Sequence, residues 1–243
     1  PFNVACWGGD LEVCKLLFSV GISDDITKPD DNLDTPMINA CLGGNLSLCE
    51  WLYEIGAGGD IRNANKEWCT PMHMACEGGH LHICKWLYMV GAADDIRKQD
   101  KEECTPMVYA CIHGCLDVCK WLYQVGAADD ISKPNCYGQS PLMLTIDNQR
   151  MHVLKWIIEE GADKDIFKVD NFGTTPLINA CCFDNLSIFE LILKEGPKEH
   201  ISYADEDGNT PMHTGCTCGN LSICKLLLEN GGDSDVLKKN NKQ

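Results

Sequence analysis

The chain has 243 residues, of which 44% are hydrophobic and 23% are charged, a balance typical of a folded protein rather than a disordered one. Its formal net charge of −16 repels phosphate backbones, so we expect no nucleic acid partner and a better match to a basic protein surface. The sequence has no run of about 18 apolar residues, so it predicts no membrane-spanning helix and no membrane partner.

Three kinds of residue recur along the whole chain at intervals of 35 residues. The prolines of this series are Pro1, Pro36, Pro71, Pro106, Pro141, Pro176 and Pro211. The glycines are Gly21, Gly56, Gly91, Gly126, Gly161, Gly196 and Gly231. An aliphatic series follows in the same register at Ile26, Ile61, Ile96, Ile131, Ile166, Ile201 and Val236. This fixed period predicts a repeat protein, with units at about 1–35, 36–70, 71–105, 106–140, 141–175, 176–210 and 211–243.

Each unit carries the signals for two short helices, which are clearest in the third unit. Thr70 caps the first helix, predicted from Pro71 to Gly78, because its hydroxyl accepts from free N–H groups and Pro suits the first helical position. A second helix is predicted from about Leu81 to Val90, where apolar residues recur at helical spacings. Gly91 ends it in a conformation that only Gly adopts at little cost. Predicted caps of other second helices are Asp10, Asn45, Asn185 and Asn220.

A pair of short helices cannot bury its apolar face alone, whereas stacked neighbours can. We therefore predict an all-α repeat solenoid in which residues 1–243 form one array of helix–turn–helix units. The array starts in the first turn of a helix and stops inside a connection, and its end units carry ordinary apolar residues where natural arrays have polar caps. We interpret the sequence as a fragment of a longer chain.

These motifs resemble the ankyrin repeat. Residues 70–75, Thr-Pro-Met-His-Met-Ala, are similar to the family's Thr-Pro-Leu-His-x-Ala, and residues 79–87, 161–163 and 170–176 are similar to its other repeat motifs. The resemblance covers the whole chain. It implies ankyrin-type units whose first helices line a concave groove, whose second helices form the convex back, and whose β-hairpin or loop fingers project. It also implies protein–protein recognition without catalysis.

The sequence departs from the family pattern in three ways. Each unit is longer than the family's usual unit of about 33 residues. The turn glycine is replaced by Leu33, Trp68 and Glu103, so those turns need a different or costlier geometry. The fifth unit has Asn148-Gln149 in place of a glycine pair. We expect less regular hairpins at these places, not a different fold.

Eleven of the 17 cysteines occupy two repeat positions, and the ankyrin family prefers Ala and Val there. We predict that they are small, buried, reduced side chains, which indicates an intracellular protein of the cytoplasm or nucleus. A disulfide ladder is one alternative, and zinc clusters within residues 111–119 and 213–218 are another. Because two of these thiols are expected in the core, we predict no metal and no cofactor. The eleven are Cys6, Cys41, Cys76, Cys111, Cys181 and Cys216, then Cys14, Cys49, Cys84, Cys119 and Cys224.

Other patterns also have structural interpretations. The series Trp51, Trp86, Trp121 and Trp156 could stack on nucleic acid bases, but in an acidic chain we predict that it packs against neighbouring side chains. The glycosylation-like Asn-Leu-Ser sequences at residues 45, 185 and 220 are expected to be helix caps. No phosphate loop, His-Glu-x-x-His or Gly-x-Ser-x-Gly motif occurs, so we predict no catalytic residues and no enzyme.

We expect the binding site among positions that change from unit to unit. Large apolar residues at such positions predict a central patch of Trp68, Met74, Tyr109, Ile112 and Leu144, because aromatic and apolar clusters mark interfaces. Acidic residues around the patch are expected to contact the partner: Asp31, Asp34, Glu67, Glu77, Glu102 and Glu103. The alternative is that several of the apolar residues simply pack between repeats.

The leading functional hypothesis is a scaffold that binds an unidentified partner protein through its groove and fingers. A second hypothesis is RNA binding by a pentatricopeptide-type array, which also repeats near 35 residues; the acidic charge and the Thr-Pro and Gly-Ala punctuation count against it. A third is a regulatory segment of a larger enzyme or channel.

Overall fold

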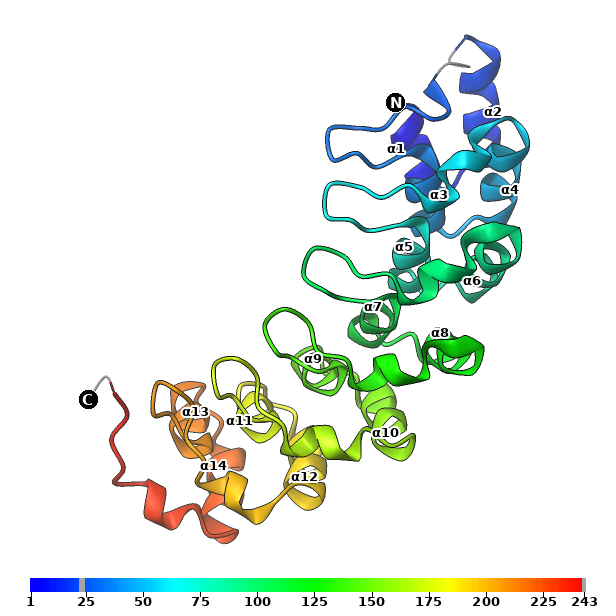
Figure 1. The fold of residues 1–243 in the computed structure, drawn as a ribbon. Helices are drawn as coiled ribbons and strands as arrows, with labels where there is room; N and C mark the ends of the chain where they lie inside the picture. The colour runs from blue at the N-terminus through cyan, green and yellow to red at the C-terminus, as the bar shows by residue number, and fades with distance from the viewer. Residues whose placement is uncertain (22–24, 242–243) are drawn as a thin grey trace. The chain divides into compact units, whose positions relative to one another are not determined.

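The computed structural model describes residues 1–21 and 25–241, which form helices and loops and contain no β-strand. The contacts group the chain into two compact units, Pro1–Asp130 and Ile131–Gln243. In each unit the helices come in pairs, and loops project beside the first helix of each pair (Figure 1). The prediction of an all-helical repeat stack is confirmed.

The first unit contains four helix pairs. The pairs are α1 (Phe2–Trp7) with α2 (Leu11–Ser19), α3 (Pro36–Gly43) with α4 (Leu46–Glu54), α5 (Pro71–Glu77) with α6 (Leu81–Leu87), and α7 (Pro106–His113) with α8 (Leu116–Leu122). Short helical turns follow the second helices: η2 (Ala57–Arg62), η3 (Tyr88–Ala92), η4 (Ala93–Arg97), η5 (Tyr123–Ala127) and η6 (Ala128–Ser132). Each first helix packs on the next, as α1 does on α3 and α3 on α5.

The second unit contains three helix pairs. They are α9 (Pro141–Asp147) with α10 (Met151–Glu159), α11 (Pro176–Cys181) with α12 (Leu186–Glu195), and α13 (Pro211–Thr217) with α14 (Leu221–Glu229). Short turns follow at η7 (Ala162–Phe167), η8 (Lys198–Ile201) and η9 (Gly232–Asp235).

Side-chain caps begin most of these helices, as the sequence predicts. The Thr35 hydroxyl accepts from Ile38 N–H at 3.3 Å, and the Asn45 amide oxygen accepts from Leu48 N–H at 3.1 Å. Asn220 is an exception. It stands before α14, but its amide does not cap that helix and instead donates to Cys181 O of the preceding repeat at 2.7 Å. The prediction of a capping side chain is wrong there, because the bond between repeats takes its place.

The second helices mostly end at a glycine with positive φ, such as Gly91 with φ 123°. The sixth repeat differs. Its Gly196 is extended, with φ −82° and ψ 168°, and Pro197 follows. The glycine series is therefore a packing and turn signal in six repeats but not a left-handed stop in the sixth.

The fingers are side-chain-closed loops, not the β-hairpins that the resemblance implied. In the first unit they are residues 30–34, 65–69 and 100–104. Asn65 Oδ1, for example, accepts from Glu67 N–H at 3.0 Å and from Cys69 N–H at 2.9 Å. Only single backbone bonds join successive fingers, such as Lys66 N–H to Asn32 O at 2.8 Å. Strand ladders need longer runs of such bonds, so these segments stay loops.

Most of the repeat-periodic cysteines fill the core. Nine of the eleven are buried, which confirms the prediction for them. Their sulfurs lie in contact across each helix pair: 3.8 Å for Cys6 and Cys14, 3.9 Å for Cys41 and Cys49, 3.7 Å for Cys76 and Cys84, and 3.8 Å for Cys111 and Cys119. The prediction is wrong for Cys216, which is exposed, and for Cys224, which is half-buried. Within the described residues no later helix covers α13.

The tryptophan series packs between helix pairs, as predicted. Trp86, Trp121 and Trp156 are buried, and Trp51 is half-buried. Tyr53 meets the Trp86 ring edge-on at 5.8 Å between ring centroids, and Tyr88 meets Trp121 in the same way at 5.8 Å. These rings are occupied by their neighbours and are not a base-stacking surface.

Candidate protein-binding surface

Trp68 lies at the tip of the finger formed by residues 65–69. Its side chain is 57% exposed, and its backbone is left-handed with φ 65°. Leu33 and Glu103 adopt the same conformation in the neighbouring fingers, with φ 63° and 64°. Residues with a side chain strain there by roughly 1–2 kcal/mol. The finger thus holds a large aromatic ring in solvent at a position that local structure would give to glycine.

Acidic side chains surround this tip within the first unit. Glu67, Glu102 and Glu103 are all exposed, and Glu67 Oε1 lies 3.6 Å from Lys101 Nζ. Asp31 is exposed at the preceding finger. Asp34 is half-buried, accepts from Asn65 Nδ2 at 2.8 Å, and has its pKa raised by burial. The acidic rim expected from the sequence therefore lies along the fingers, with Asp34 at their base.

Tyr109 ties α7 to two fingers. Its hydroxyl donates to Asp100 Oδ2 at 2.8 Å and lies 3.0 Å from Cys69 Sγ, and its ring meets His73 edge-on at 5.4 Å between centroids. Burial, followed by the Cys69 thiol, raises the pKa of Tyr109. Half of the ring is covered, so Tyr109 holds the finger bases in place beside whatever surface it offers a partner.

The other predicted apolar residues are less exposed than Trp68. Met74 is only 8% exposed, and Ile112 and Glu77 are half-buried. Leu144, also half-buried, lies on α9 in the second unit and not with the other four. Packing between repeats, the alternative interpretation, fits Met74 well.

Sequence reasoning missed other exposed apolar finger residues. In the second unit Tyr137 and Phe172 directly precede the turn glycines and are exposed, Phe172 by 56%. Their signal was available, because they stand one residue before the finger position of Trp68 in the 35-residue register. It also missed ion pairs between repeats, in which Arg62 reaches Asp95 at 3.0 Å and Arg97 reaches Asp130 at 2.8 Å.

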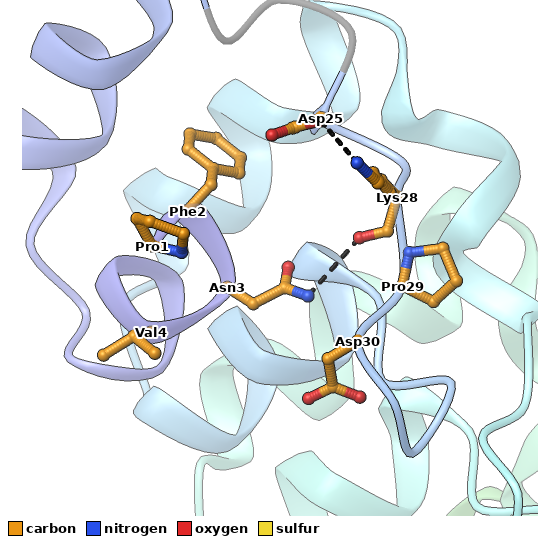
Figure 2. Close-up of a pocket in the computed structure, with 8 residues that line it drawn as sticks. All are labelled: Pro1, Phe2, Asn3, Val4, Asp25, Lys28, Pro29 and Asp30. Carbon is orange, nitrogen blue, oxygen red and sulfur yellow. Dashed lines mark hydrogen bonds and ion pairs between the residues drawn. The ribbon is translucent and has the colours of Figure 1, made fainter.

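A hollow of about 280 Å³ lies beside α1 (Figure 2). Asn3 Nδ2 donates across it to Lys28 O at 3.3 Å, and Lys28 Nζ lies 3.5 Å from Asp25 Oδ1. Asp30 uses a carboxylate oxygen to hold its own finger, accepting from Asn32 N–H at 2.8 Å. These groups serve each other, so we place no ligand site there. Among residues 1–21 and 25–241, no cluster of three or more His, Cys, Asp or Glu side chains could hold a metal ion.

Stacked helix pairs with projecting loops define a helical repeat protein. A family model for ankyrin repeats matches residues 2–97, 89–168 and 164–240, and the chain belongs to the ankyrin repeat family. The crystal structure of the human ASB11 ankyrin repeat domain is similar to this structure, with a TM-score of 0.73, 22% sequence identity, and coverage of 96% of this chain and 98% of that chain. A search of curated protein sequences gave no match. None of the described helices has the length and apolar character needed to cross a membrane.

Proposed function

We propose that the protein binds a partner protein with a basic surface, and that the fingers of the first unit make the central contact. Trp68 carries the proposal. Its ring is exposed, its backbone is strained, and it occupies a place where Gly138, Gly173 and Gly208 serve other fingers. Strain kept at a surface position, with an aromatic group that packs little, is typical of a recognition residue.

The charge around Trp68 supports a basic partner. Glu67, Glu102 and Glu103 are exposed near it, and the whole chain carries a formal charge of −16. Such a surface attracts Lys- and Arg-rich segments and speeds their encounter. We assign Tyr109 and Ile112 to the edge of the contact and Glu77 to its flank. Met74 supports the surface from below, and Leu144 belongs to any extension of the contact onto the second unit.

Two of the other hypotheses have different standing. RNA binding named a pentatricopeptide-type array, whereas the family match is to ankyrin repeats. A regulatory segment of a larger enzyme or channel stays a prediction, as do the single array over 1–243, the longer parent chain and the intracellular location.

Selection from a displayed library of random peptides against the 243-residue chain tests the proposal. We expect enrichment of sequences rich in Lys and Arg with an apolar anchor. The best peptide should bind Trp68→Gly at least tenfold more weakly, a loss of about 1.4 kcal/mol or more, while the thermal stability of the variant stays at or above that of the parent. Glycine suits the left-handed backbone, so a binding loss cannot come from a damaged finger.

A charge-matched pair of variants separates local contact from overall charge. One carries Glu67→Lys, Glu102→Lys and Glu103→Lys. The control carries the same charge change on exposed second-helix residues of the first unit: Glu50→Lys, Glu54→Lys and Asp117→Lys. We expect only the finger variant to lose the peptide at physiological salt. Equal losses in both would show a nonspecific charge effect, and no effect of Trp68→Gly would remove the fingers from the binding surface.

A further inference from the structure

The seventh repeat carries a thiol pair like those of repeats one to four, but in a different environment. Cys216 Sγ on α13 and Cys224 Sγ on α14 lie 3.9 Å apart. Cys216 is exposed and Cys224 half-buried, whereas both members of every equivalent pair are fully buried. In those repeats the following first helix covers the sulfurs. This pair is therefore the one of the five to which a reagent in water has access.

The residue beside this pair also differs. Gly215 stands where the other repeats have Ala, except for Thr145 in the fifth. A Cβ at Gly215 would lie 3.1 Å from Cys224 Sγ, closer than most side-chain contacts. The glycine thus leaves room for the Cys224 sulfur to move. Movement is needed, because a disulfide bond requires the two sulfurs to approach to about 2.05 Å.

We propose that Cys216 and Cys224 form a redox-sensitive dithiol that closes to an intramolecular disulfide by exchange with a small disulfide of the glutathione type, while the buried pairs stay reduced. The Cys216 thiolate attacks one sulfur of glutathione disulfide and releases one glutathione. The Cys224 thiolate then attacks the Cys216 sulfur of the mixed disulfide and releases the second. Two protein thiols are oxidised, one glutathione disulfide is reduced to two glutathiones, and the thiol protons pass to the released thiolates.

The order of the two steps follows from exposure. Cys216 is the accessible sulfur and makes the first attack, whereas burial and then the Cys216 thiol raise the pKa of Cys224. The second attack is intramolecular, so the short separation compensates for a small thiolate fraction. The product is a covalent tie between α13 and α14, which leaves fewer conformations to the unfolded chain and should raise the melting temperature of the last repeat.

Two other exposed thiols compete for the same reagent. Burial and then the nearby Cys218 thiol raise the pKa of Cys182 to about 11, which places Cys182 and Cys218 close to each other. Cys218 also lies two residues from Cys216. The proposal requires the bond between Cys216 and Cys224 to form in preference to any link that includes Cys182 or Cys218.

The test incubates the reduced 243-residue chain with glutathione disulfide under native conditions, quenches with acid, alkylates the remaining thiols, and maps the peptides by mass spectrometry. We expect a peptide pair joined through Cys216 and Cys224, and alkylation of the Cys41 and Cys49 pair only after unfolding. Cys224→Ser should trap glutathione on Cys216. Gly215→Ala, which restores the residue of the other repeats, should slow closure severalfold while circular dichroism shows the same helix content.

Reversal by dithiothreitol, together with a higher melting temperature of the oxidised form, completes the expected result. The proposal is overturned if the main product joins Cys182 to Cys218, if glutathione stays on Cys216 of the parent chain without closure, or if the buried pairs oxidise as fast as this one. It is equally overturned if Cys216→Ser, confirmed as folded, still forms a disulfide at Cys224.

Discussion

The third repeat, in the first unit, and the seventh, in the second, share a sequence and differ in their burial. Both contain Thr-Pro-Met-His, and in both the histidine Nδ1 accepts from the capping Thr N–H, at 3.1 Å for His73 and 3.3 Å for His213. Both rings also reach the carbonyl of a lysine in their own repeat, Lys98 at 3.0 Å and Lys238 at 3.1 Å. His73 is fully buried, whereas His213 is half-buried. Local sequence sets the bonds, and the neighbouring repeats set the burial.

The largest expected effect of that difference is an acid response at His73. Burial lowers the pKa of His73 from 6.5 to about 4. Between these values the unfolded chain binds a proton that the folded chain refuses, so stability falls as the pH drops from about 6.5 to about 4. The loss amounts to about 3 kcal/mol, and the stabilisation is fully present only above pH 6.5.

Denaturant unfolding of the parent and of His73→Gln, measured across this pH range, checks the response. The variant should be less stable at neutral pH, by about 2 kcal/mol, because buried hydrogen bonds are lost, and its stability should change less with acid. His213→Gln should lose less at neutral pH, since water replaces its bonds more easily. Equal neutral-pH losses at the two positions would break the comparison between the repeats.

The second unit contains a group with the opposite response. Burial, followed by the charge of Asp170, raises the pKa of Asp147 from 3.8 to about 6. The folded chain therefore binds this proton more readily than the unfolded chain. The destabilisation present above about pH 6 disappears as the pH falls towards 3.8, a gain of about 2 kcal/mol after allowance for partial exposure.

Asp147→Asn removes this carboxylate and should stabilise the protein at neutral pH by about 2 kcal/mol. The variant should also lose the part of the parent's stabilisation that appears on mild acidification. Calorimetry at about pH 7 and about pH 4.5, with the parent as reference, measures both effects. A variant as stable as the parent at both pH values would show that Asp147 is already well solvated. Combined with His73→Gln, it distinguishes the acid responses of the two units.

The sequence predicts the repeated part of this fold well because repetition averages out local ambiguity. The 35-residue register places the helices, most of their caps and the buried cysteines, since each is a local signal repeated in equivalent surroundings. It fails where surroundings are not equivalent. Cys216 has the same motif as Cys76 and is exposed, because burial depends on a following helix that the motif does not encode.

The candidate site was less predictable for a related reason. Variation from repeat to repeat marks Trp68 and Met74 alike as released from the core pattern. Only the structure shows that Trp68 extends into solvent and that Met74 is buried. A variable position on a first helix can pack between neighbours, whereas the tip of a loop has few neighbours. Finger position was therefore a better signal of exposure than apolar variation.

The smallest effect concerns two fingers of the same design. Glu103 in finger 100–104 of the first unit and Gly173 in finger 170–174 of the second are both left-handed, with φ 64° and 73°. Glu103→Gly should relieve roughly 1–2 kcal/mol of strain and cost about 0.5–1 kcal/mol of extra freedom in the unfolded chain. The expected net gain in unfolding free energy is about 0.5–1 kcal/mol.

The reverse change calibrates that gain. A Cβ at Gly173 would lie 3.1 Å from Glu206 N in the next finger, so Gly173→Ala should destabilise by more than Glu103→Gly stabilises. Urea unfolding of both variants and the parent gives the two signs. If Glu103→Gly lowers stability, the Glu103 side chain makes contacts that outweigh the strain. If it raises stability but also weakens the selected basic peptide, the first unit keeps a strained residue at this tip because binding needs its carboxylate there.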